Sequence, residues 1–425
     1  MQHAAALLRS LPPTLADAPE ADVEWSSSGL SRLGDAALAG AVAAAITAPK
    51  RDADTSFLTH APLELAARAA LLPMIAPAAR DHARRRIASI AAQYARAGDE
   101  IDEPSLEFAN AMQASDALSS AIGSGDPEIA DAALVYLVPR MTGPQLGRVI
   151  APVILPMLGA AAHAPILLGE LPRLEKQIAG AALLLRAPIR MIAKAPGERL
   201  TWHQDRGAAP FAGDPRAELF ARLAAAPPVR SASVYIAPTM LAVEAQGVAE
   251  RLLGDVTAAL SVDAAERMVL RVAALSMLQD DPASAPYGWT HALTMPQGVF
   301  AIADAVDDKI ALIGIAATYA LGFRATMGKA RLTQEPPLRP RSPAYRDVAP
   351  IDAAGAVYHA DGSLIPEIKT ALAMRAAVHR DAHLAKYTLA AFDAAARDPG
   401  AARLYLAAAA YLGAWWDAHP DAGFE

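Results

Sequence analysis

The chain has no cysteine among its 425 residues. Without thiols it cannot form disulfides, zinc–thiolate sites, iron–sulfur clusters or a thiol nucleophile. Aromatic residues are also scarce, at 5% of the chain, whereas 54% is hydrophobic and dominated by alanine and leucine. Because these two are the strongest apolar helix formers, we expect an all-α fold: one large multi-helix domain spanning residues 1–425, with minor strand or hairpin content.

A basic excess is missing as well, since the formal net charge is -7. This disfavours a nucleic-acid binder, because phosphate binding needs clustered positive charge. The N-terminus lacks the charged start and long apolar core of a secretory signal, so we expect a cytoplasmic protein. Two apolar stretches resemble membrane spans, but prolines interrupt residues 150–169 and residues 310–323 fall short of the roughly 20 that a span needs. Buried core helices explain both, and no membrane partner is expected.

Helix breakers divide most of the chain into helical segments. Residues 1–34 contain several prolines and a serine run and are expected to be irregular. The proline-rich residues 334–350 are expected to form an extended surface segment or a lid. Only residues 231–237 alternate as a strand would, and residues 365–397 read as one long helical segment. No internal repeat or long linker indicates a second domain.

The signatures of several common enzyme classes are absent. There is no Gly-x-Gly-x-x-Gly element after a strand, no phosphate-binding loop and no Gly-x-Ser-x-Gly elbow. The Glu-x-x-His motif of carboxylate-bridged di-iron bundles is also missing from the candidate helices. A site that is rich in histidine and poor in carboxylate would therefore be mononuclear.

Five of the ten histidines occupy apolar or helical settings: His60, His163, His291, His379 and His383. A single histidine of this kind is more often a core residue bonded to a backbone carbonyl than a ligand. In helical bundles, however, metal sites are built from inward-pointing side chains on different helices. Imidazole nitrogen suits iron, copper, zinc or nickel. Spacing alone does not show that these histidines meet.

The segment from His379 to Lys386 carries the clearest conflict. If it is helical, His379, His383 and Lys386 fall at i, i+4 and i+7 on one face. A cationic lysine on an apolar face is costly unless it is paired, deprotonated or chemically modified. The simpler alternative is a lysine that reaches water from the helix edge. The pattern predicts a functional site.

Around these histidines the chain resembles the questin oxidase-like family, α-helical proteins that include oxygenases opening a ring of anthraquinone-type aromatic polyketides. The resemblance covers five short windows between about residues 57 and 411. The windows are Thr59-His60-Ala61-Pro62, Ala162-His163-Ala164-Pro165, Trp289-Thr290-His291-Ala292 with its following Leu-Thr-Met-Pro, Asp381-Ala382-His383 with Lys386, and the alanine-rich stretch after Tyr405. At positions 59 and 61 this chain has threonine and alanine where the family pattern has asparagine and glycine.

The resemblance implies a non-haem iron(II) held by four histidines and a lysine carboxylated on its side-chain nitrogen. In this chain the ligands would be His60, His163, His291, His383 and Lys386. CO2 would supply the carbamate on Lys386, and O2 would be the co-substrate. His379 is then expected either to orient a ligand or to transfer a proton, as a catalytic residue.

The leading hypothesis is an iron(II) oxygenase that uses O2 for ring cleavage or oxygen insertion on a bulky aromatic or quinone substrate. Tyr287, Trp289, Met295 and Phe300 are candidate pocket walls, although an ordinary core role explains them equally well. Any NADPH requirement would be met by a separate reductase or by earlier reduction of the substrate, and the chain is expected to be a monomer or homodimer. Two other hypotheses remain: a metal-dependent hydrolase with a carboxylated lysine, and a metal-free helical binding protein for an apolar ligand.

Overall fold

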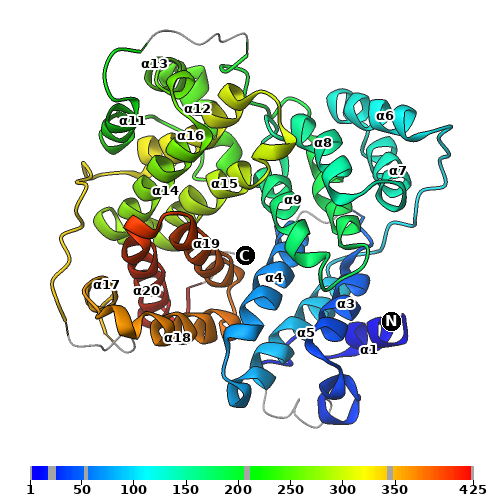
Figure 1. Ribbon diagram of the computed structural model, residues 1–425. Helices are drawn as coiled ribbons and strands as arrows, with labels where there is room; N and C mark the ends of the chain where they lie inside the picture. Colours follow the sequence, from blue (N-terminus) through cyan, green and yellow to red (C-terminus); the bar gives the residue numbers. More distant parts are fainter. Residues whose placement is uncertain (1, 18–24, 52–55, 205–210, 342–347, 423–425) are drawn as a thin grey trace.

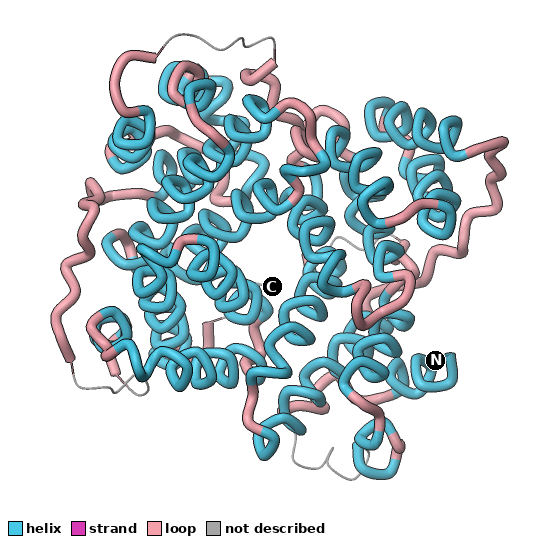
Figure 2. Tube along the Cα trace, in the orientation of Figure 1, coloured by secondary structure: helices cyan, strands magenta, loops and turns pink. Residues whose placement is uncertain are grey.

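The computed structural model describes residues 2–17, 25–51, 56–204, 211–341 and 348–422. It is 72% helical, which confirms the all-α prediction. Figure 2 shows helices joined by loops, and within the described ranges no β-strand occurs. Two isolated bridges, Lys50 to Glu100 and Met157 to Arg199, are the strand-like pairings recorded there. The expected minor strand content is therefore wrong for this part of the chain.

Helices follow one another through the whole sequence (Figure 1). The first nine described are α1 (Gln2–Ser10), α3 (Asp35–Ile46), α4 (Phe57–Leu71), α5 (Arg80–Arg96), α6 (Ala111–Ser124), α7 (Pro127–Leu137), α8 (Gly143–Ile154), α9 (His163–Leu174) and α10 (Arg186–Lys194). The rest are α11 (Pro215–Ala224), α12 (Ile236–Ala245), α13 (Val248–Leu253), α14 (Val262–Gln279), α15 (Thr290–Ala301), α16 (Lys309–Met327), α17 (Pro350–Tyr358), α18 (Ile365–Val378), α19 (Ala382–Arg397) and α20 (Ala402–Ala418).

Two sequence expectations are corrected by local chemistry. Residues 1–34 are not irregular throughout, because α1 buries Ala5 and Leu8 and packs against α3 and α5. Residues 232–235 form bends instead of a strand, because the Ser231 and Ser233 hydroxyls bond nearby backbone groups. Helix α12 then starts at Ile236.

The long helical segment expected over residues 365–397 is two helices. Helix α18 ends at Val378, and His379 has an extended backbone after it. The Asp381 carboxylate then accepts the backbone N–H of His383 and caps the start of α19. The prediction that His379, His383 and Lys386 share one helical face is therefore wrong, because this cap separates the first of them from the other two.

Helix α16 is the one described helix that is long and apolar enough to cross a membrane, at 19 residues. It extends further than the apolar stretch 310–323 suggested from the sequence. Of its apolar window, 83% is buried against the rest of the protein. Its neighbours include α12, α14 and α15, so its apolar surface is used in core packing.

Helices α4, α9, α15 and α19 form a closed ring of contacts. Helix α4 packs against α9, α9 against α15, α15 against α19, and α19 back against α4. In Figure 1 these four surround the middle of the molecule, although they come from the first, second and last thirds of the chain. A π-helical turn, Ala285–Trp289, leads directly into α15. The ring brings distant segments of sequence to one place.

Glycine permits the close approach of α9 and α15. A Cβ atom at Gly298 of α15 would lie 2.8 Å from the Cα and 2.9 Å from the backbone nitrogen of Ile166 in α9. A Cβ at Gly169 of α9 would lie 2.7 Å from the Cβ of Ala301. Because backbone atoms cannot rotate away, the helices would have to separate to admit a methyl group at position 298.

We therefore expect Gly298→Ala to lower the free energy of unfolding by about 1–3 kcal/mol, the usual cost of overpacking. The matched control is Gly123→Ala in α6, where a Cβ would meet nothing within 4 Å. That change should leave stability unchanged or raise it by up to about 1 kcal/mol, since alanine favours helix over glycine. Urea denaturation followed by circular dichroism measures both. Equal effects of the two substitutions would contradict the close α9–α15 packing.

Candidate metal centre

Each helix of the ring contributes one histidine from its first turn. His60 is the fourth residue of α4, His163 the first of α9, His291 the second of α15 and His383 the second of α19. All four are buried, with at most 4% of their surface exposed. The structure thus brings together the four histidines that the sequence singled out as ligands.

The four imidazoles are in mutual contact. The Nε2 atoms of His60 and His163 are 3.1 Å apart. Ligand nitrogens of His60, His163 and His291 all lie within 4.8 Å of one another. The ring of His383 adjoins this group, with its centroid 4.9 Å from that of His60 and 5.1 Å from that of His291. Four rings from four helices form one cluster.

Hydrogen bonds at Nδ1 fix the orientation of three of the rings. The carbonyl of Tyr287 accepts the Nδ1–H of His291 at 2.7 Å, since a carbonyl can only accept. The Asp381 carboxylate accepts from Nδ1 of His383 at 3.0 Å. The third ring oriented in this way is that of His163.

The Thr59 hydroxyl donates to the carbonyl of Ser56, so its oxygen accepts from Nδ1 of His163 at 3.1 Å. In all three rings Nδ1 carries the proton and Nε2 keeps a lone pair. Metal-binding histidines are typically held in this way.

These donors fit a metal ion of the first transition row. Two nitrogens bound at about 2.1 Å and at right angles would be about 3.0 Å apart, close to the His60–His163 separation. Within the described part of the chain, Nε2 of His383 is buried and has no hydrogen-bond partner. A buried nitrogen without a partner costs free energy, and a bound cation would remove that cost.

Burial and neighbouring positive charge disfavour the protonated form of three of the imidazoles. Burial lowers the pKa of His60, His163 and His291 well below the usual value of 6.5. The positive charge of Lys386 and the charges of neighbouring imidazoles lower the pKa of each further. Neutral imidazole is the form that binds metals. At neutral pH these three rings therefore require no proton loss before they bind.

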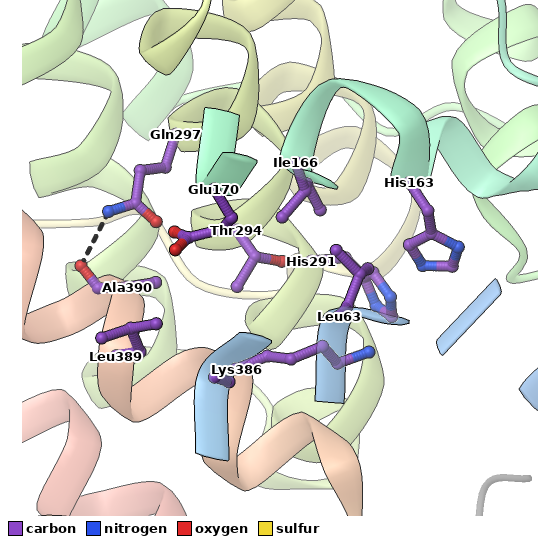
Figure 3. Close-up of a pocket in the computed structure, with 11 residues that line it drawn as sticks. Leu63, His163, Ile166, Glu170, His291, Thr294, Gln297, Lys386, Leu389 and Ala390 are labelled. Atoms are coloured by element: carbon purple, nitrogen blue, oxygen red, sulfur yellow. Dashed lines mark hydrogen bonds between the residues drawn. The ribbon is translucent and has the colours of Figure 1, made fainter. Parts of the chain in front are cut away.

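Lys386 follows His383 by one turn of α19, and only 9% of its surface is exposed. Figure 3 shows its side chain extending past Leu63 toward the rings of His291 and His163. An ammonium group in this position faces three imidazoles whose pKa values its charge lowers. The side chain therefore does not extend from the helix edge to water, which was the simpler alternative for this lysine.

Asp381 supplies a negative charge in contact with the cluster, 3.0 Å from Nδ1 of His383. Burial alone would raise its pKa, but the interaction with His383, together with Lys386, lowers the pKa to about 2. Because Asp381 both caps α19 and accepts the Nδ1–H of His383, it fixes the position and the tautomer of this ring.

A fully buried arginine holds the turn that carries Asp381. Arg68, two turns after His60 on α4, donates to the carbonyls of Ala377 and His379 at 2.7 Å. Glu64 of the same helix pairs with the Arg68 guanidinium at 2.6 Å. These bonds satisfy the last carbonyls of α18, which have no partners within their own helix. The helix that carries His60 therefore also anchors the turn leading to His383.

His379 stands outside the cluster. Its ring contacts Trp416, with centroids 5.1 Å apart, and its Nδ1 accepts the backbone N–H of Asp381. Burial lowers the pKa of His379 to about 4, so the ring is neutral at physiological pH. Its contact with the centre is indirect, through the turn at Asp381, which fits the expected orienting role better than proton transfer.

A small cavity of about 30 Å³ adjoins the cluster. This volume admits roughly two water-sized molecules. The centre forms one end of the cavity, and Glu170, Thr294 and Gln297 form a polar patch at the other (Figure 3). Apolar side chains complete the lining: Leu63, Ala67, Ile166, Leu389 and Ala390.

The expected pocket walls occupy other places. Trp289, Met295 and Phe300 are buried in the core and do not line this cavity. The Trp289 indole donates to the carbonyl of Asp281, an ordinary core arrangement. Tyr287 does adjoin the centre, with its ring centroid 4.4 Å from that of His291. Of the four, Tyr287 alone contacts the cluster.

The start of the proline-rich segment 334–350 lies at a different cavity. Gln334, Glu335 and Pro336 help to line a space of about 690 Å³, together with Tyr358 and Arg403. None of these residues lines the cavity at the histidines. Residues 342–347 of the expected lid lie outside the described residues.

Sequence reasoning missed four residues that shape the centre: Thr59, Arg68, Glu170 and Asp381. Glu170 follows His163 by two turns on α9, a spacing that places both on one face and could have indicated it. Asp381 carried a capping signal, two residues before a helical histidine. Nothing local in the sequence connects Arg68 to the carbonyls of α18, because that contact spans 309 residues.

Glu170 provides a test of the cavity's polarity. Burial raises the pKa of its carboxyl from the ordinary 4.5 to about 7, against the opposing effect of Arg173. A proton bound more tightly in the folded state stabilises it fully below pH 4.5, and this stabilisation is lost as pH rises toward 7. The shift corresponds to at most about 3 kcal/mol.

We expect Glu170→Gln to raise the thermal midpoint relative to wild type at pH 8 but not at pH 5. The control is Glu175→Gln, which changes an exposed carboxyl just beyond α9. It should follow wild type at both pH values in differential scanning calorimetry. A Glu170→Gln effect that is independent of pH would show that the carboxyl is already ionised in the folded protein at pH 5.

Comparison with known proteins assigns no family to the chain. No family model, no curated protein and no solved structure matches it. The case for a metal centre rests on the four buried histidines, Lys386 and their hydrogen-bond partners. The resemblance to the questin oxidase-like family remains a prediction from the sequence.

Proposed function

We propose that this protein is a non-haem iron(II) oxygenase. The observation that carries the proposal is the convergence of four buried imidazoles, three of them oriented through Nδ1, next to the amine of Lys386. Zinc sites usually take four ligands, whereas a metal that prefers six would keep a position open beside five protein donors. Bound iron(II) would supply the redox chemistry that activates O2. The ligands in the proposal are His60, His163, His291, His383 and a carbamate on Lys386.

A carbamate on Lys386 would balance the charge of the buried site. The neutral amine adds to CO2, forming an N–C bond and releasing one proton. Iron(II) would bring two positive charges, the carbamate one negative charge and Asp381 another, and imidazoles that bind a metal are neutral. The sum is zero, which is the condition under which a buried ionic group costs least. With an unmodified ammonium at Lys386, the net charge of the site would be +2.

The size of the cavity limits what reaches the centre in this conformation. About 30 Å³ accommodates O2 or CO2, whereas pockets for larger organic ligands measure about 300–1,000 Å³. A flat aromatic or quinone substrate would therefore require Ile166 and Leu389, on α9 and α19, to move apart. Thr294 and Gln297 offer hydrogen bonds to a substrate hydroxyl or carbonyl at the polar end. Electrons would come from a separate reductase or from a substrate reduced beforehand.

The cavity bears on both alternative functions, and it supports one of them and disfavours the other. A metal-dependent hydrolase is supported by Glu170, whose pKa of about 7 suits a general base beside the cavity. A metal-free binding protein is disfavoured by the same cavity, which is too small for an apolar organic ligand. Zinc or nickel in the purified protein, without oxygen consumption, would favour the hydrolase.

The first test is the metal content of protein purified without added metal, measured by elemental mass spectrometry. We expect near-stoichiometric iron in wild type and loss of most of it in His291→Ala and His383→Ala, because each substitution removes one ligand. His82→Ala is the matched control, since His82 is exposed on α5. Absence of bound iron, also after anaerobic loading with iron(II), would reject the oxygenase.

The second test concerns Lys386. Lys386→Ala should lower iron content and oxygen consumption, and a small carboxylate such as propionate should restore part of both by filling the vacated space. Lys386→Met, which keeps the apolar stem and lacks the amine, separates the effect of packing from that of charge. A carbamate carbon signal in ¹³C NMR after exposure to labelled CO2 should appear in wild type and not in Lys386→Met. Full iron binding in Lys386→Met would exclude the ligand role.

A further inference from the structure

Two tyrosines connect the histidine cluster to the protein surface. The ring of Tyr287 lies 4.4 Å from His291 and 6.3 Å from His383, measured between centroids. The ring of Tyr235 lies 5.9 Å from that of Tyr287 in an edge-to-face arrangement. Tyr235 is 64% exposed, and its neighbour Val234 is 59% exposed. A row of rings therefore runs from the cluster to solvent.

Polar contacts fix this row in place. The backbone carbonyl of Tyr287 accepts the Nδ1–H of His291, so the tyrosine is bonded to a ring of the cluster. Its hydroxyl interacts with the backbone of Ile236, which directly follows Tyr235. Tyr287 also lies in the π-helical turn before α15, a rare conformation that is frequent at functional sites. The backbone of Tyr287 is thus tied to the cluster and its hydroxyl to the backbone next to Tyr235.

Tyr287 is an oxidisable ring in contact with two histidines of the cluster, His291 and His383. Another aromatic neighbour is Phe323, whose ring centroid lies 6.2 Å from that of His291, and phenylalanine is much harder to oxidise than tyrosine. Cysteine is absent from the whole sequence. An oxidised centre would therefore have Tyr287 as a readily oxidised neighbour in direct contact with its histidines.

We propose that Tyr287 and Tyr235 form an electron relay that carries oxidising equivalents from the centre to the surface when no substrate is bound. The proposal rests on the proposed function, because the centre must first react with O2. Electron transfer falls off exponentially with distance, so closely spaced rings form the favoured route. The relay would protect the histidine ligands from oxidation.

The electrons and protons balance as follows. Tyr287 would give one electron to the oxidised centre and its phenolic proton to the solvent, to which this residue is partly exposed. The Tyr287 radical then takes an electron and a proton from Tyr235, restoring its phenol. The Tyr235 radical takes a hydrogen atom from a reductant in solution, an enediol such as ascorbate or a thiol. In total, the centre gains one electron, the reductant loses one hydrogen atom, and one proton is released.

The experiment uses iron-loaded full-length protein, mixed with hydrogen peroxide in the absence of substrate and frozen rapidly. Electron paramagnetic resonance should show a tyrosyl radical in wild type. The signal should be lost in Tyr287→Phe. In Tyr235→Phe it should persist on Tyr287, and ascorbate should quench it severalfold more slowly than in wild type. Tyr136→Phe, in the distant helix α7, is the control and should behave as wild type.

A second readout does not depend on the radical signal. Peptide mass spectrometry after repeated exposure to peroxide should find more oxidised His291 and His383 in Tyr287→Phe than in wild type at equal iron content. An unchanged radical in Tyr287→Phe, or equal histidine oxidation in all variants, overturns the relay alone. Protein that binds no iron overturns the proposed function and the relay with it.

Discussion

Burial of five nitrogen bases at one junction of four helices is the constraint on which this structure depends. Five protonated groups could not coexist there, because each would lose its hydration and repel the others. Burial holds the pKa of His60, His163 and His291 well below 6.5, and each oriented ring has one acceptor at Nδ1. What remains is a set of lone pairs directed inward and one amine. A bound cation would stabilise such a set of donors, which supports the proposed metal centre.

The position of the histidines within their helices strengthens this effect. His60 and His383 lie in the first turns of α4 and α19, and the start of a helix carries a partial positive charge. Converging helix starts disfavour imidazolium and ammonium and favour anionic groups. Asp381 places a negative charge at the start of α19, where its carboxylate accepts hydrogen bonds from the backbone N–H and the ring Nδ1 of His383. A carbamate at Lys386 would place a second negative charge in the same field.

The sequence predicted the all-α class, and it selected the four histidines and Lys386 that the structure places together. Periodicity and composition suffice for the first, and apolar context with a local resemblance for the second. The break between α18 and α19 was missed because alanine-rich residues on both sides favour helix, while the cap at Asp381 and the bonds from Arg68 outweigh that preference. The cavity lining was also missed. Glu170 and Gln297 meet through contacts between α9, α15 and α19, and no local pattern encodes these.

Small side chains make the convergence possible. Imidazoles on four different helices reach one another only if the helix backbones approach closely, and the bulk of an ordinary side chain prevents this. Alanine dominates the chain, and Gly298 lets α15 touch the backbone of α9 at Ile166. Between α4 and α19, the buried guanidinium of Arg68 links α4 to the turn before α19 through hydrogen bonds to backbone carbonyls. The composition that first indicated only helix thus also sets the spacing of the centre. A larger residue at these contacts would separate the donors even if every histidine remained.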